Sequence, residues 1–108
     1  MAFFYWGFLN MDWQHHHATI NGIRMHYVEQ GEGMPVVLCH GFPHLWFSWH
    51  RQITALAEAG YRVIAPDMRG MGQTEGPADP ACYDIEHITG DLLGLLDHAG
   101  VERAVFAG

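Results

Sequence analysis

The spacing of apolar and polar positions changes several times along the chain, and each change predicts a different element. Two short stretches, residues 17–20 and 23–29, flank Asn21-Gly22, a dipeptide that favours the two-residue turn of a β-hairpin. After a glycine-containing turn, residues 36–39 form a uniformly apolar run. We therefore predict a hairpin followed by a third strand.

Beyond this run the apolar spacing becomes helical. Four apolar residues lie three or four positions apart, namely Trp46, Trp49, Ile53 and Leu56. They predict a helix that ends at Gly60. Residues 62–65 are again uniformly apolar after an initial arginine, and they predict a fourth strand that Pro66 stops.

A polar loop rich in glycine and proline, residues 67–83, leads into a second predicted helix. Asp84 stands where an N-cap is expected, and Gly100 stands where the helix is expected to end. One face of this helix is apolar and consists of Ile85, Ile88, Leu92, Leu95, Leu96 and Ala99. A last apolar strand is predicted at residues 104–107.

The three later strands are uniformly apolar rather than alternating, which indicates burial on both faces. With helices between them, they predict an α/β fold in which a hairpin precedes a β-α-β-α-β unit with parallel strands and right-handed crossovers. An open α/β sheet binds its ligand outside the carboxyl ends of its strands. Residues 40–43, residues 67–70 and Gly108 follow such ends, so we expect them to meet at one cleft.

Composition narrows the class of protein. Hydrophobic residues make up 49% of the 108 residues and charged residues 16%, which suits a buried sheet and argues against disorder. The formal net charge is −7, and Lys plus Arg total only 5. Because no basic stripe is present, we do not expect nucleic acid as a partner.

The first twelve residues differ from the rest of the chain. Residues 1–12 are apolar and aromatic and contain neither Lys nor Arg. They are shorter than the roughly 20 residues that cross a bilayer, and they lack the positive region and cleavage site of a signal peptide. We therefore expect an N-terminal extension at 1–12, one α/β unit at 13–108 and no membrane association. Cys39 in an apolar run and Cys82 in a polar loop favour a reduced, cytoplasmic setting.

Three segments in succession resemble the α/β-hydrolase-fold epoxide hydrolases. The first is residues 38–49, which contain His40-Gly41-Phe42-Pro43; the others are residues 60–74 and residues 83–108. With the hairpin, the resemblance covers nearly the whole chain. It implies the N-terminal part of an α/β-hydrolase fold that ends just before the nucleophile elbow, with an incomplete sheet and no lid.

The resemblance also implies a mechanism. In that family an aspartate attacks an epoxide carbon to form an ester, lid tyrosines protonate the epoxide oxygen, and a histidine oriented by a carboxylate activates water to hydrolyse the ester. The oxyanion of this second step needs preorganised donors. The backbone N–H of Phe42 takes this role by resemblance, supported by His40, Gly41 and Pro43, which follows a cis bond in the family. The side chains of Phe42 and Trp46 are expected to shape the substrate pocket.

By the same resemblance, the nucleophile, the second oxyanion donor, the lid tyrosines, the acid and the catalytic histidine are not among these residues. We therefore expect no turnover from residues 1–108 alone. The resemblance implies a small-molecule epoxide as substrate, with neither a cofactor nor a metal.

Several polar residues also have structural interpretations. His40 at a strand end is expected to brace the turn rather than to act as a general base. Asp67 and Arg69, with Gly70, are expected to pin the loop by hydrogen bonds and mutual charge. We expect Cys39 to be inert packing. On the second helix, three acidic residues are expected on a solvated face: Glu86, Asp91 and Asp97.

The histidine run 15–17 could be considered as a metal site, with His26 joining across the hairpin. Successive strand residues point to opposite faces, so the three do not converge on one ion, and a solvated surface run is expected instead.

Two other functions compete with epoxide hydrolysis. Haloalkane and haloacetate dehalogenases share the fold, the aspartate nucleophile and a similar turn, although residues 46–49 and 60–69 favour epoxides. A non-catalytic interaction module is the second alternative, because an unpaired edge at the last strand and uncovered apolar helix faces invite self-association.

Overall fold

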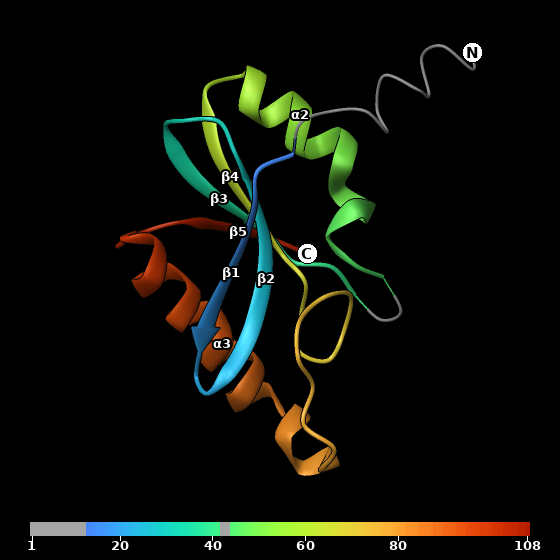
Figure 1. The fold of residues 1–108 in the computed structure, drawn as a ribbon. Coiled ribbons are helices and arrows are strands. Elements are labelled where there is room, and N and C mark those ends of the chain that lie inside the picture. The colour runs from blue at the N-terminus through green and yellow to red at the C-terminus, as the bar shows by residue number, and fades with distance from the viewer. Residues whose placement is uncertain (1–12, 42–43) are drawn as a thin grey trace, which may run out of the picture.

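The computed structural model describes residues 13–41 and 44–108, so the predicted extension 1–12 lies outside the described residues. A five-stranded mixed sheet forms its centre, with the strand order β1-β2-β4-β3-β5 (Figure 1). The strands are β1 (His15–Ile20), β2 (Ile23–Gln30), β3 (Met34–Leu38), β4 (Tyr61–Pro66) and β5 (Val105–Ala107). β1 and β2 pair antiparallel, as do β2 and β4, whereas β3 is parallel to both β4 and β5. The predicted hairpin and parallel strands are confirmed.

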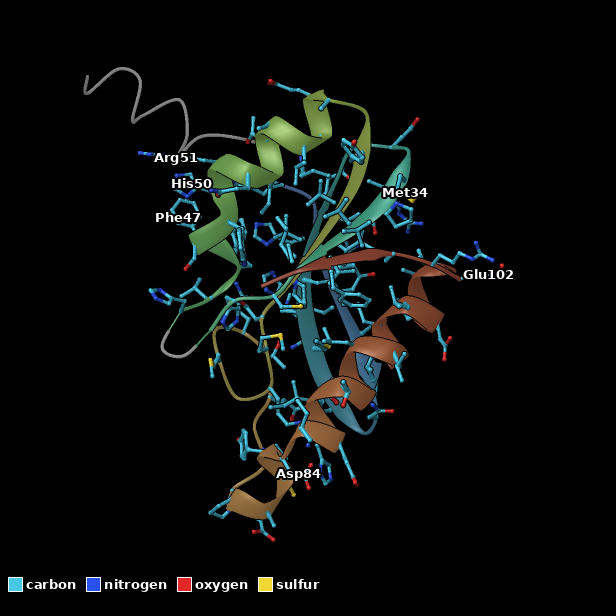
Figure 2. The ribbon with its side chains drawn as sticks, turned by 180° about the vertical axis from the view of Figure 1, so that it is seen from behind. Met34, Phe47, His50, Arg51, Asp84 and Glu102 are labelled. Carbon is cyan, nitrogen blue, oxygen red and sulfur yellow. The ribbon has the colours of Figure 1, made fainter. Side chains whose placement is uncertain are left out.

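Two longer helices lie on either side of this sheet (Figure 1). The first begins as the 3-10 helix η1 (Trp46–Trp49) and continues as α2 (His50–Glu58). Where the two meet, the rings of Phe47 and His50 stack with centroids 4.4 Å apart (Figure 2). The second helix, α3 (Ile85–Ala99), follows a 3-10 turn, η2 (Pro80–Tyr83), inside the predicted loop.

The uniformly apolar strands are explained by two hydrophobic clusters, one on each face of the sheet. On β3, Val36 and Leu38 belong to the cluster that contains Ile53 of α2, whereas Val37 belongs to the cluster that contains Leu95 of α3. β4 alternates in the same way between the two clusters. Because both faces are covered, neither strand has a polar side, as the sequence predicted.

The ends of the elements follow the expected capping residues. Asn21 and Gly22 have φ values of 51° and 79°, which gives the two-residue turn between β1 and β2 its left-handed backbone. Asp84 accepts a hydrogen bond from the His87 N–H at 2.9 Å at the start of α3, where Figure 2 labels it, and Gly100 ends the helix with φ 71°. The bonds from His87 lower the pKa of the Asp84 carboxyl.

The apolar face of α3 differs from the predicted one at its first turn. Leu95 and Leu96 are buried, but the Ile85 side chain is 72% exposed. The predicted burial of the last strand on both faces is wrong within the described residues, because Val105 and Phe106 of β5 are exposed and β5 pairs only with β3. Among the helices that the structure describes, none has the length and apolarity needed to cross a bilayer.

Two glycines with nearly the same φ provide a test of close packing. Gly31 (φ 80°) lies against β4 and α2, and a Cβ built on it would come within 2.2 Å of the Tyr61 carbonyl oxygen. A Cβ on Gly22 (φ 79°) would have no heavy atom within 4 Å.

We therefore expect Gly22→Ala to lower the free energy of unfolding by about 1 kcal/mol, the cost of a left-handed backbone with a Cβ. Gly31→Ala adds a clash to the same strain, and its cost should exceed that of Gly22→Ala by about 2 kcal/mol. Urea unfolding of the full-length protein measures both. Equal losses would contradict the close approach of Gly31 to β4.

Candidate functional site

The carboxyl ends of three parallel strands lie side by side at one edge of the sheet. β3 continues into Cys39 and His40, and the Cys39 N–H donates to the Ala107 carbonyl of β5 at 2.8 Å. On the other side of β3, the His40 imidazole reaches Met68, just after β4. The three strand ends therefore lie together, as parallel pairing requires, and the cleft expected between them stays a prediction.

Both ring nitrogens of His40 are engaged in hydrogen bonds. Nε2 accepts the Met68 backbone N–H at 2.9 Å, and Nδ1 lies 3.1 Å from the Gly41 carbonyl oxygen. A carbonyl only accepts, so Nδ1 carries the proton and His40 is the neutral Nδ1–H tautomer. The lone pair that a general base would use is occupied by Met68. This geometry makes His40 a brace between the turn and the loop after β4.

The turn itself is described on both sides of residues 42–43. The His44 N–H donates to the Gly41 carbonyl oxygen at 2.8 Å and so closes a tight turn. Gly41 faces open space, since a Cβ built on it would have no heavy atom within 4 Å. Phe42 and Pro43 lie outside the described residues, so the oxyanion role of the Phe42 N–H stays a prediction, as does the cis bond before Pro43.

Asp67, directly after β4, is a buried carboxylate that accepts three hydrogen bonds. Oδ1 accepts the backbone N–H of Trp46 at 2.9 Å. Oδ2 accepts hydrogen bonds from the backbone N–H of Gln73 at 2.9 Å and from Nδ1–H of His26 at 2.7 Å. Gly72 leaves room for this carboxylate, because a Cβ there would come within 2.3 Å of Oδ2. The three donors come from three separate segments, which Asp67 holds together.

Arg69 makes a second buried polar cluster, with a different partner from the one expected. Its guanidinium forms a two-bond ion pair with Asp91 of α3, with Nε···Oδ2 at 2.8 Å and Nη2···Oδ1 at 2.7 Å. Nη1 donates to the Cys82 carbonyl at 3.1 Å. The bonds to Asp91 raise the pKa of Arg69 above its usual value.

Two sequence-based expectations are corrected by this geometry. Asp67 and Arg69 do not pair with each other; each finds its partner on another element. Asp91 is not on a solvated face, because its side chain is only 2% exposed and is covered by Arg69 and by the hairpin residue Asn21. Gly70 lies in this loop with φ 76° and against the Tyr83 ring, where a Cβ would meet the hydroxyl oxygen at 2.8 Å.

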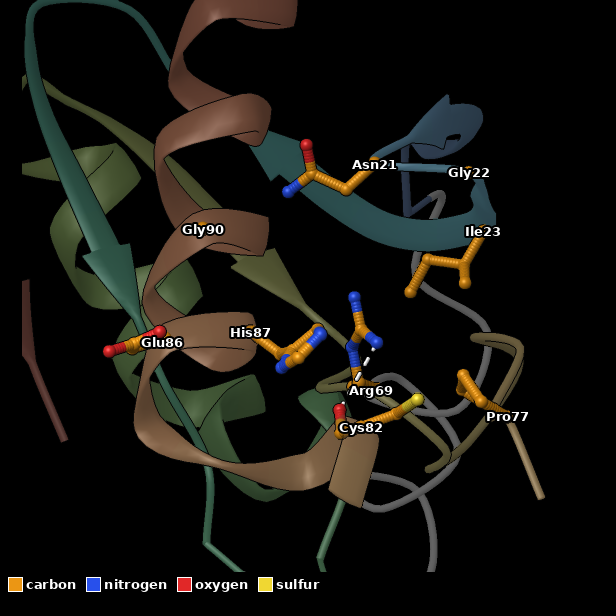
Figure 3. Close-up of a pocket in the computed structure, with 9 residues that line it drawn as sticks. All are labelled: Asn21, Gly22, Ile23, Arg69, Pro77, Cys82, Glu86, His87 and Gly90. Atoms are coloured by element: carbon orange, nitrogen blue, oxygen red, sulfur yellow. Dashed lines mark hydrogen bonds between the residues drawn. The ribbon is translucent and has the colours of Figure 1, made fainter. Parts of the chain in front are cut away.

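A hollow of about 510 Å³ opens beside this ion pair (Figure 3). Arg69 and Cys82 form its floor, with Asn21 on one wall and His87 and Gly90 of α3 on another. Three of the five guanidinium N–H groups donate to Asp91 and to the Cys82 carbonyl, and the charge is paired with Asp91. The arrangement therefore ties the loop to α3, and the Arg69 charge is already neutralised by Asp91.

Trp46, expected in the pocket wall, is 7% exposed and packs inside an aromatic group. Its ring meets the rings of Trp13, Phe47 and His15 edge to face, with centroids 5.3 to 5.4 Å apart. Trp46 lines neither the hollow beside Arg69 nor the one lined by Cys39, Leu92 and Phe106.

The remaining candidates are the Cys39 thiol and the histidines of the hairpin. Burial raises the pKa of the Cys39 thiol, which keeps it protonated and unreactive at neutral pH. Across residues 13–41 and 44–108, no group of three or more His, Cys, Asp or Glu side chains could hold a metal ion. His15 is not simply a solvated residue, because its Nδ1 lies 2.9 Å from Nε2 of the buried His26.

The Asp67–His26 bond was not expected from the sequence. One feature of the sequence could have indicated it. His26 lies between apolar residues in a predicted strand, and a buried histidine needs a hydrogen-bond partner.

Comparison with known proteins decides the family. A family model described as "alpha/beta hydrolase fold" matches residues 34–108. The chain belongs to the α/β-hydrolase fold family. This α/β-hydrolase chain is 50% identical over 94 residues to "Epoxide hydrolase 1" of Siraitia grosvenorii and 57% identical over 90 residues to "Epoxide hydrolase A" of Mycobacterium tuberculosis. These alignments cover 85% and 82% of the chain but only 30% and 28% of the two relatives.

Solved structures give the same result. The crystal structure of epoxide hydrolase VrEH1 from Vigna radiata superposes with a TM-score of 0.85 at 47% identity, over 87% of this chain and 30% of that one. Epoxide Hydrolase A from Mycobacterium thermoresistibile superposes with a TM-score of 0.83 at 47% identity, over 88% of this chain and 30% of that one. The chain therefore spans about 30% of the length of these relatives.

The buried ion pair yields a matched test on α3. Asp91→Ala leaves the Arg69 cation buried without a partner, and we expect it to lower the free energy of unfolding of the full-length protein by about 3 kcal/mol or more. Asp97→Ala, at an exposed position of the same helix, should change it by less than about 0.5 kcal/mol.

The double variant Arg69→Met with Asp91→Leu should regain most of the loss, because no unpaired charge then remains at this position. Denaturant unfolding compares the four proteins. Similar losses for Asp91→Ala and Asp97→Ala would show that the pair is not buried.

Proposed function

We propose that this chain is the N-terminal part of an epoxide hydrolase, which opens a small-molecule epoxide to a vicinal diol through an ester on an enzyme aspartate. The nucleophile, the lid tyrosines and the charge-relay residues of this scheme lie outside residues 1–108, so the proposal concerns the longer protein. The two cysteines, Cys39 and Cys82, are free, which supports a cytoplasmic location for it.

The observation that carries the proposal is the turn at the end of β3. Its entry is held through His40, which accepts the Met68 N–H, and its exit is held through the Trp46 N–H, which donates to Asp67. The partners in these two hydrogen bonds, Asp67 and Met68, are therefore adjacent residues just after β4. A turn fixed in this way needs little rearrangement when charge develops beside it. Identities of 50% and 57% to epoxide hydrolases support the choice of substrate class.

In this scheme the turn acts in the second step. Water attacks the carbonyl carbon of the ester, and the carbonyl oxygen becomes an oxyanion that the Phe42 N–H is proposed to stabilise. Effective donors lie about 2.7–3.1 Å from that oxygen. Phe42 is also proposed to shape the pocket with its side chain, and Trp46 to support the pocket from the core behind it. His40 contributes through the turn and not as the base.

The first test is the reaction itself. The full-length protein should convert styrene oxide to its diol and release no halide from 1-bromobutane. In a single turnover in H₂¹⁸O, the diol should carry no ¹⁸O, because water attacks the ester carbonyl and the label stays on the enzyme carboxylate. Mass spectrometry of diol and enzyme measures this. Halide release without diol would favour the dehalogenase alternative.

The second test asks whether His40 supports the turn or acts as a catalytic base. In His40→Gln the amide oxygen can accept the Met68 N–H, so we expect kcat within about tenfold of the native enzyme. In His40→Phe that N–H loses its acceptor, and kcat should fall by about a hundredfold, comparable with the loss of an oxyanion donor. Steady-state diol formation measures both. Equal, severe loss in the two variants would indicate that the imidazole itself reacts.

A further inference from the structure

Three side chains form a hydrogen-bonded row from the surface of the hairpin into the interior. Nδ1 of His15 on β1 lies 2.9 Å from Nε2 of His26 on β2, and Nδ1 of His26 lies 2.7 Å from Oδ2 of Asp67. The His26 and Asp67 residues are both 0% exposed, whereas His15 is exposed. The His15 and His26 rings are stacked, with centroids 5.1 Å apart. The row gives the buried carboxylate one link to the surface.

The acceptor at the inner end determines where the protons are. The Asp67 carboxylate accepts backbone N–H bonds on both oxygens, so Nδ1 of His26 carries the proton in their shared bond. When His26 is neutral, its Nε2 accepts from Nδ1–H of His15. When His26 takes up a proton, Nε2 donates and Nδ1 of His15 accepts. The same heavy-atom positions therefore serve both charge states.

The main chain of His26 is also hydrogen-bonded to the Asp67 segment. Thr74 Oγ accepts the backbone N–H of His26 at 3.0 Å and donates to the backbone oxygen of Asp67 at 2.7 Å. The Asp67 N–H donates to the His26 carbonyl at 2.9 Å. His26 is thus bound to Asp67 through both main chain and side chain, and the carboxylate that receives the Trp46 N–H has one orientation.

We propose that His26, supported by His15, is a positioning residue for the turn 40–43: it orients the Asp67 carboxylate, which fixes the Trp46 N–H at the exit of the turn. The inference rests on the proposed function, because it assigns to this turn the oxyanion of ester hydrolysis. It adds a residue from the hairpin, remote in sequence from the turn, to the machinery of that step.

The ionisable groups that face His26 are Asp67 after β4 and His15 and His17 on β1. Burial lowers the pKa of His26 below its usual 6.5, the two histidines act in the same direction, and Asp67 opposes them. His26 is therefore neutral at pH 7. As the pH falls below 6.5 the unfolded chain takes up a proton that folded His26 resists, so this residue's contribution to stability decreases on acidification.

The kinetic test follows the two chemical steps separately in the full-length protein. His26→Leu removes the donor to Asp67, while His26→Asn places an amide donor near the position of Nδ1. In rapid-quench experiments with styrene oxide and excess enzyme, His26→Leu should form the ester within about twofold of the native rate. Its ester hydrolysis should be slower by about 10- to 100-fold, since only that step uses the oxyanion donor.

Rescue and a matched control separate positioning from general destabilisation. His26→Asn should recover ester hydrolysis to within about fivefold. His17→Leu removes an imidazole whose ring lies 4.9 Å from that of His26 and whose Nε2 lies 3.3 Å from the side-chain oxygen of Gln73. This imidazole makes no bond to Asp67, and the variant keeps the backbone N–H of Gln73, so both steps should be unchanged. Proportional slowing of both steps in His26→Leu, or no rescue by Asn, would overturn the proposal.

A second readout needs no substrate. In full-length protein labelled with ¹⁵N-tryptophan, the Trp46 amide, assigned by its disappearance in Trp46→Phe, should titrate with the same midpoint as the His26 ring, on the acid side of pH 6.5. This titration should vanish in His26→Asn and persist in His17→Leu. If the Trp46 amide shift does not change as His26 titrates, the proposal is overturned even when the protein is an active epoxide hydrolase. If the Trp46 amide and the His26 ring titrate together in a protein that opens no epoxide, the proposed function is overturned. The coupling between His26 and the turn is then still supported.

Discussion

The buried carboxylate of Asp67 is the constraint on which this part of the molecule depends. A carboxylate removed from water without donors costs several kcal/mol, so it must find partners wherever the chain can supply them. Here they come from the β2 side chain His26, from the backbone of Trp46 and from the backbone of Gln73. Satisfying one charged group therefore aligns a strand, the turn after β3 and the loop after β4.

The loop after β4 is held on both sides of the sheet by residues two positions apart. Asp67 is bound to β2 and to the start of η1, whereas Arg69 is bound to Asp91 on α3. Functional loops are usually the mobile part of a fold and are positioned by a rigid scaffold. In this chain the two buried polar clusters fix the loop itself to the strands and helices around it. The residues on both sides of the proposed oxyanion donor, His40 and Trp46, are hydrogen-bonded to that same loop.

In the proposed reaction, this arrangement assigns positioning and bond breaking to different parts of the protein. The described residues fix His40 and Trp46, on either side of the proposed oxyanion donor, at the carboxyl ends of parallel strands, and the bond-breaking groups are assigned to residues outside 1–108. Positioning groups and reacting groups would then be contributed by different parts of the polypeptide. Variants in the present residues are for that reason expected to alter the rate of one step rather than to abolish the chemistry, because transition-state stabilisation is separable from nucleophilic attack.

The elements themselves were predictable from the sequence because they depend on local properties. Helical and uniformly apolar spacing marked the helices and buried strands, Asn21-Gly22 marked the hairpin, and Asp84 with Gly100 marked the ends of α3. These features act within a few residues, so no knowledge of the fold was needed to read them. The resemblance carried by His40-Gly41-Phe42-Pro43 added the family, and the parallel strands placed that turn at the sheet edge.

The partners of the buried charges were decided only by tertiary structure. His26 and Asp67 are 41 positions apart, and Arg69 and Asp91 are 22 apart. Periodicity shows on which side of α3 Asp91 lies, but not that a loop and a hairpin turn cover that side. A surface histidine run likewise gave no sign that His15 completes a row into the core. Burial of a polar group depends on what distant segments place over it, and that information arises only when the chain is folded.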